Sequence, residues 1–83
     1  MSGYCVVTFP STHAAMQAEK HLKGALPVQM IPTPRCISAS CGIALRFDPS
    51  SLPEAQKALA AFPEPFALYQ LAGESPTLLL CKK

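Results

Sequence analysis

Charged side chains are scarce in this sequence. They make up 14% of the 83 residues, against about 25% in an average soluble domain, and the net charge is only +2. The one basic run is the terminal pair Lys82-Lys83. We therefore expect no nucleic-acid partner, because binding nucleic acid requires a basic patch or stripe. A surface so poor in charge instead predicts that another protein covers part of it, and we expect a homodimer.

Long hydrophobic runs and targeting signals are also missing. No apolar stretch approaches the roughly 20 residues of a membrane-spanning helix, and the N-terminus lacks the basic and apolar regions of a signal peptide. We expect a cytoplasmic protein with no membrane partner, whose cysteines are reduced thiols. The length and the apolar content of 49% predict a single domain over 1–83, with a core that needs no metal staple.

The common catalytic and metal-binding patterns are absent as well. Paired carboxylates, a glycine-rich phosphate loop and a Ser/His/Asp set are all missing, and Asp48 is the only aspartate. The four cysteines, Cys5, Cys36, Cys41 and Cys81, form no C-x-x-C pair and no zinc-like spacing, so we expect no metal. Cys5 lies among apolar residues of a predicted strand and is expected in the core, whereas Cys81 has no expected role.

The order of predicted elements is β-α-β-β-α-β with one added strand. Strands are expected at 4–9, 28–31, 42–47, 66–71 and, as a short fifth, 77–81; helices are expected at 12–23 and 52–62. This order is typical of an α+β, two-layer ferredoxin-like split βαβ sandwich. Its antiparallel four-stranded sheet has the order 4-1-3-2, with both helices on one face. Residues 4–71 are the expected core, and 72–83 form a C-terminal extension.

Local signals mark the helix ends. Ser11 or Thr12 can cap the first helix, and Gly24 can end it. Before the second helix, Ser51 and Glu54 stand at the spacing of a capping box. We therefore expect the Ser51 side chain to cap that helix.

The segment 31–42 holds the densest group of reactive and conformationally special residues. Pro32 and Pro34 disfavour a helix here, because proline fixes φ and restricts the residue before it. Gly42 would let the backbone beside Cys41 approach a ligand closely or take a positive φ. The segment therefore predicts a rigid loop that presents a thiol.

The expected topology gives this thiol a specific neighbour. The third strand would begin beside the end of the first, so Cys41 would face the start of the first helix at Ser11, Thr12 and His13. A helix N-terminus offers unpaired N–H groups and about half a positive charge, which lowers the pKa of a nearby thiol. His13 and Arg35 could add to this effect.

Ordinary structural roles stay open for the same residues. Cys41 could be a small buried residue beside a turn, and the distance from Cys36 to Cys41 is unknown. A loop arginine more often stabilises its loop than clamps an anion, and a first-turn histidine is more often solvated than catalytic. Ser38 and Ser40 would matter to a thiolate only if their hydroxyls hydrogen-bond it.

One run of residues matches a known pattern. The run P-R-x-I-S-x-S-C-G at 34–42, with the flanking segments 4–14, 18–22 and 45–47, is similar to the small selenium/sulfur carrier protein-like family over about residues 4–71. The resemblance implies a protein that carries sulfane sulfur or selenium on one cysteine, which is Cys41. Arg35, Ser38, Ser40 and Gly42 belong to the same motif and would surround this thiol. Cys36 is not expected in the motif and is a possible second thiol.

The resemblance implies a group carrier rather than an enzyme in its own right. A donor of the cysteine desulfurase or selenocysteine lyase type would load Cys41 as a persulfide or selenosulfide, and an acceptor protein would take the atom. Attack on the donor needs a thiolate, partial exposure and groups that stabilise negative charge. No cofactor is required.

Two other hypotheses remain. The chain could be a non-catalytic homodimeric interaction or regulatory domain with a structural cysteine, pairing through the sheet face that lacks helices. Residues expected on that face are Tyr4, Val6, Thr8, Ala44 and Tyr69. Alternatively, Cys36 and Cys41 could form a redox switch if their Cα atoms come within about 7 Å.

Overall fold

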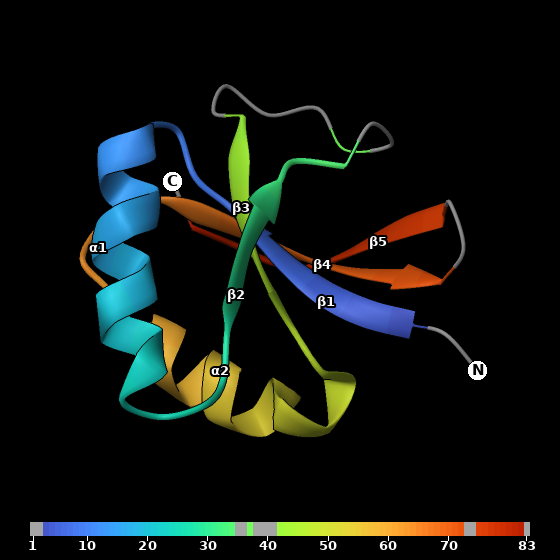
Figure 1. Ribbon diagram of the computed structural model, residues 1–83. Helices are drawn as coiled ribbons and strands as arrows, with labels where there is room; N and C mark the ends of the chain where they lie inside the picture. Colours follow the sequence, from blue (N-terminus) through green and yellow to red (C-terminus); the bar gives the residue numbers. More distant parts are fainter. Residues whose placement is uncertain (1–2, 35–36, 38–41, 73–74, 83) are drawn as a thin grey trace.

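The structure is a computed structural model that describes residues 3–34, 37, 42–72 and 75–82. Within these residues the chain forms five strands, two α-helices and one 3-10 turn (Figure 1). In chain order they are β1 (Gly3–Thr8), α1 (Thr12–Lys23), β2 (Gln29–Pro32), β3 (Ile43–Phe47), η1 (Pro49–Ser51), α2 (Leu52–Ala60), β4 (Phe66–Ala72) and β5 (Ser75–Lys82). The expected α+β class is confirmed. Neither described helix is long and apolar enough to cross a membrane.

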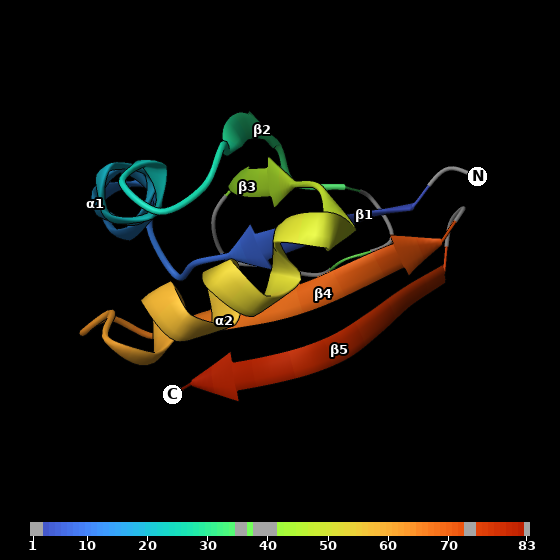
Figure 2. The same cartoon turned by 90° about the horizontal axis from the view of Figure 1, so that it is seen from below.

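The strands form one antiparallel sheet in the order β2-β3-β1-β4-β5. The sheet therefore has five strands, where the sequence predicted four and a possible short fifth. β5 is the longest strand, with eight residues, and it pairs along the whole of β4 with a register shift at Leu68/Tyr69. It forms one edge of the sheet, and β2 forms the other (Figure 2).

The main hydrophobic core lies between the helices and one face of the sheet. α1 contributes buried alanines and Leu22, and α2 contributes Ala55 and Leu59. They pack in one cluster with side chains of β1, β3 and β4 that include Cys5, Leu45 and Leu68. The alanines of α1 carry only a methyl group, so the helix can lie close to the strands. Complete burial of Leu22 and Leu59 contributes about 1.5–3 kcal/mol each.

A smaller cluster lies on the opposite face of the sheet, which has no helix among the described residues. Val6, Ala44 and Leu71 project from three neighbouring strands, and Ile37 from the β2–β3 connection packs against them. Val6 and Ala44 have no exposed surface, and Ile37 is only 5% exposed. Ile37 therefore covers part of the face that the described helices leave open.

The two helices begin in different ways. The Ser11 hydroxyl accepts a hydrogen bond from the Ala14 amide at 3.2 Å, so Ser11 caps α1 as expected. The capping box predicted for α2 is wrong, because the Ser51 side chain makes no capping bond. The turn η1 precedes α2 directly, and Asp48 caps that turn by accepting from the Ser50 amide at 2.8 Å.

Candidate functional site

The cysteine segment, residues 33–42, has its two ends joined at the β2–β3 edge of the sheet. The Thr33 amide donates to the Gly42 carbonyl at 3.0 Å, one step beyond the last β2–β3 pair, Pro32 with Ile43. This bond continues the β2–β3 ladder and holds the two ends of the segment together. The cysteine motif is therefore closed at its base by the sheet itself.

A buried isoleucine holds the middle of the segment. The Ile37 amide donates to the Pro34 carbonyl at 3.1 Å, and the Ile37 side chain belongs to the cluster of Val6 and Ala44 on the helix-free face. Isoleucine in the motif thus has a packing role. It ties the cysteine-bearing segment to β1 and β3.

The start of α1 and the start of β3 lie at the same end of the sheet (Figure 1). Thr8, the last residue of β1, pairs with Ala44 near the beginning of β3. The chain reaches the cap of α1 three residues after Thr8, at Ser11. The start of α1 with the residues before it (9–13) and the start of β3 (42–44) therefore lie at one end of the molecule. These are the two segments that were expected to lie beside Cys41.

The candidate site residues fall into two groups. Ser11, Thr12, His13 and Gly42 are described, and all four are exposed. Arg35, Cys36, Ser38, Ser40 and Cys41 lie outside the described residues, so the redox-switch hypothesis and the Cys41 environment stay predictions.

Gly42 has neither a positive φ nor a crowded Cβ position, the two features that would require a glycine here. Its φ lies outside the positive region, and a Cβ built on it would meet no atom within 4 Å. Of the two alternatives that the sequence left open for Gly42, the structure therefore rules out a positive φ. The exposed, uncrowded backbone remains consistent with close approach by another molecule.

The two described cysteines differ in accessibility. Cys5 is completely buried in the main core, as its strand pattern predicted. Burial raises the pKa of its thiol, and the negative charge of Asp48 raises it further. Cys81 is exposed on the edge strand β5. Cys5 therefore stays neutral and protected, whereas Cys81 can react with small reagents.

The face expected to pair in a homodimer is already partly covered within one chain. Val6 and Ala44 have no exposed surface, and Thr8 is 5% exposed. The Thr8 hydroxyl also lies within 3.5 Å of the Ala67 carbonyl and donates to it. Only Tyr4 and Tyr69 of the five expected residues keep partial exposure. Of the five expected residues, a partner on this face would therefore contact these two tyrosines.

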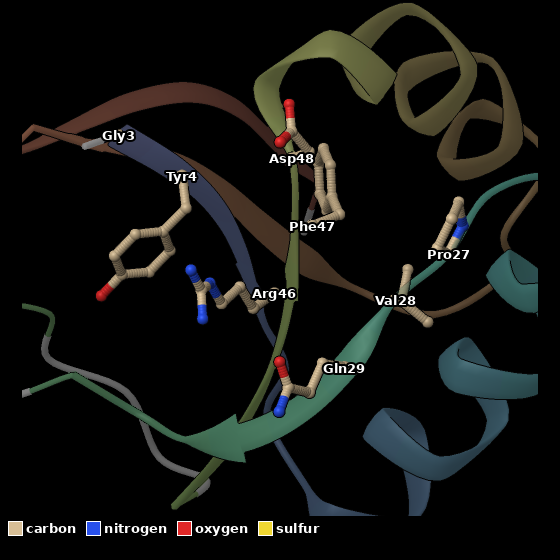
Figure 3. A pocket seen from close by; sticks show the side chains of 8 residues that line it. All are labelled: Gly3, Tyr4, Pro27, Val28, Gln29, Arg46, Phe47 and Asp48. Carbon is tan, nitrogen blue, oxygen red and sulfur yellow. The ribbon is translucent and has the colours of Figure 1, made fainter. Parts of the chain in front are cut away.

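Sequence reasoning missed a cleft that the structure places between three strand ends. The cleft has a volume of about 320 Å³ and is lined by the start of β1, the start of β2 with the residues before it, and the end of β3 (Figure 3). Its polar members include Gln29, Arg46 and Asp48. In the sequence, Arg46 stood out only as a polar position in the alternating pattern of the predicted third strand. Its pairing with Gln29 required the register of β2 on β3.

No described group of His, Cys, Asp and Glu side chains could hold a metal ion. Comparison with known proteins gave one finding. The family model described as "Putative Se/S carrier protein-like" matches residues 4–66, which include the whole cysteine segment. No curated protein and no solved structure matched the chain.

Proposed function

The chain belongs to this Se/S carrier protein-like family, and we propose that it carries one sulfane sulfur or selenium atom on the thiolate of Cys41. The family match over residues 4–66 carries the proposal, because it spans the motif in which Cys41 precedes Gly42. The protein acts as a group carrier between a donor and an acceptor, and no cofactor takes part.

Loading is a nucleophilic transfer between sulfur atoms. The Cys41 thiolate attacks the outer sulfur of a persulfide on a donor protein of the cysteine desulfurase type. A bond forms between the Cys41 sulfur and the outer sulfur, the S–S bond of the donor breaks, and the donor leaves as a thiolate. The outer sulfur keeps its proton, so electrons and atoms balance without an added oxidant. With selenium as the cargo, a selenocysteine lyase type donor delivers the atom in the same way.

The described surroundings of the segment support this chemistry. The Thr33–Gly42 bond closes the base of the segment, and Ile37 attaches its middle to the sheet. The exposed N-terminal end of α1 lies at the same end of the sheet as the start of β3, which Gly42 directly precedes. A helix N-terminus stabilises an anion, so we assign Ser11, Thr12 and His13 to the support of the thiolate. Arg35, Ser38 and Ser40 supply further donors within the motif.

The architecture fits a small carrier. We interpret β1–β4 with the two helices as a ferredoxin-like split βαβ sandwich, to which β5 adds an edge strand. We place the chain in the cytoplasm, where thiols stay reduced. We propose that it acts there as a homodimer.

Intact-mass analysis tests the proposal. The chain is incubated with a cysteine desulfurase, cysteine and the cofactor of that enzyme, and we expect a mass increase of one sulfur atom that a reductant removes. Peptide mapping should place the added sulfur on Cys41, and Cys41→Ser should abolish it.

Two further thiols provide matched controls. Cys81→Ser removes an exposed thiol outside the motif and should leave loading unchanged, and Cys36→Ser tests the neighbouring thiol. An equal sulfur adduct on Cys41→Ser, or no adduct on the unmodified chain, would reject the carrier assignment.

A further inference from the structure

The cleft at the ends of β1, β2 and β3 joins side chains of opposite charge. Arg46 and Asp48 both line it and are both exposed. Gln29 is the cross-strand partner of Arg46, so the two side chains project from the same face of the sheet. Figure 3 shows the guanidinium of Arg46 beside the ring of Tyr4, with the side chain of Gln29 below it in the view.

Stacking on an aromatic ring holds the arginine in place. The Arg46 Cζ atom lies 4.6 Å from the centroid of the Tyr4 ring, within the range of a cation–π contact. A stacked guanidinium keeps the N–H donors at its edge available, and these donors match the two oxygens of a carboxylate. No carboxylate of the described residues forms an ion pair with Arg46. The arginine therefore stacks on Tyr4 and forms no ion pair with a carboxylate of the described residues.

The aspartate in the cleft is fixed as well. One oxygen of Asp48 accepts from the Ser50 amide at 2.8 Å, and hydrogen bonds from Ser50 hold the pKa of Asp48 below its ordinary value. The charge of Arg46 adds to this lowering of the pKa, and the two side chains both line the cleft without forming an ion pair. At neutral pH the cleft therefore presents a cation and an anion that form no ion pair with each other.

We infer that this cleft binds a free α-amino acid as a zwitterion. The carboxylate of the ligand accepts hydrogen bonds from Arg46 and Gln29, and its ammonium group donates to the carboxylate of Asp48. The remaining lining includes Gly3, Tyr4 and Pro27 and leaves space for a small side chain. The inference does not depend on Cys41 or on sulfur transfer.

The charge arrangement separates this ligand from related ones. A peptide C-terminus offers the same carboxylate, but the nitrogen next to it is an amide without charge, so it cannot pair with Asp48. A ligand with several negative charges would be repelled by Asp48. The cleft volume of about 320 Å³ also lies at the lower end of small-molecule sites.

Titration of the full chain with L-alanine, followed by NMR chemical shifts or calorimetry, tests the inference. We expect saturable binding, with shifts concentrated at Gly3, Gln29 and Arg46. N-acetyl-L-alanine lacks the ammonium group and models a peptide C-terminus, whereas L-alaninamide lacks the carboxylate. Each should bind at least about tenfold more weakly, because each loses one charge-assisted pair.

Two substitutions assign the roles within the cleft. Arg46→Met keeps a long side chain over Tyr4 and should weaken L-alanine binding about tenfold or more. Asp48→Asn keeps an oxygen that can accept from Ser50 and should weaken L-alanine binding by a similar factor, without weakening that of N-acetyl-L-alanine. Lys57→Met removes an exposed cation on α2 and serves as the charge control.

Thermal unfolding of each variant shows that the fold is retained. No saturable L-alanine binding would overturn the inference, as would equal binding of N-acetyl-L-alanine and L-alanine. Unchanged L-alanine affinity in a folded Arg46→Met or Asp48→Asn variant would also overturn it.

Discussion

At the scale of single residues, the cysteines show how one residue type takes different properties from its surroundings. Cys5 has no exposed surface, and its thiol is harder to ionise than usual because burial disfavours the charged form. Cys81 is exposed on β5. A thiol that must attack a donor therefore needs a position unlike that of Cys5, and the proposed function assigns this role to Cys41.

Because the pKa of Cys5 is raised, we expect the free energy of unfolding to change with pH in the alkaline range. Above the ordinary thiol value of 9.0, the unfolded chain loses the Cys5 proton while the folded chain keeps it. The folded state then binds more protons, so its stability is intact below pH 9.0 and falls as pH rises further. The slope contributed by this one group is at most about 1.4 kcal/mol per pH unit. Urea unfolding between neutral and alkaline pH measures it.

Cys5→Val is the reference for this measurement, because valine has a similar size and does not ionise. We expect its free energy of unfolding to fall less steeply at alkaline pH than that of the unmodified chain. Parallel curves for Cys5→Val and the unmodified chain would contradict a shifted Cys5 pKa.

Residue-level properties could be predicted only where they follow from local pattern. The core position of Cys5 followed from its apolar strand, and Ser11 was a recognisable helix cap. Ser51 matched a capping box, but it became the last residue of η1 and Asp48 took the capping role. The sequence pattern could not distinguish an α-helix from a 3-10 turn that runs into one.

At the scale of elements, β5 is the largest departure from the sequence prediction. Its apolar residues 77–81 indicated a strand, but the eight-residue length and full pairing with β4 depend on the tertiary context. Leu79 packs against the main core, whereas Leu78 is 53% exposed. Successive side chains of a strand point to opposite faces, which separates Leu78 from Leu79. The register shift near Leu68/Tyr69 affects which of the two meets the core, and the sequence alone does not show this.

This difference between adjacent leucines gives a matched pair of substitutions. Leu79→Ala removes methyl groups from the edge of the core, and we expect it to lower the free energy of unfolding by about 1–2 kcal/mol. This is below the 2–5 kcal/mol of a fully buried leucine. Leu78→Ala should change it by less than about 0.5 kcal/mol. Urea unfolding measures both, and equal losses would show that the register shift does not sort the side chains in this way.

At the scale of the whole molecule, one sheet separates two clusters of unequal size. The cluster on the helix side includes Leu22, Leu45 and Leu59, all fully buried. The cluster on the other face is small, and Ile37 is its only described member outside the strands. The family motif could be identified from sequence, but the role of its isoleucine could not. That role depends on which sheet face the β2–β3 connection crosses.

Substitutions in the two clusters should therefore affect global stability and the proposed function to different degrees. Leu22→Ala opens the main core, and we expect it to cost about 2–5 kcal/mol, a large share of the 5–15 kcal/mol that stabilises a typical domain. Ile37→Ala removes the attachment of the cysteine segment while the helices and the main core stay packed. We expect a smaller loss of global stability, together with faster hydrogen exchange at the Thr33 amide and slower sulfur loading of Cys41.

Hydrogen exchange resolves the two effects, because local opening affects only some amides. In Ile37→Ala, exchange should rise at Thr33, whose amide closes the base of the segment, and the amides of β1 should follow only the change in global stability. Ile31→Ala, in a half-buried strand residue of the same cluster, controls for loss of volume alone and should load sulfur at the original rate. If Ile37→Ala leaves exchange at Thr33 unchanged, Ile37 does not hold the segment on the sheet.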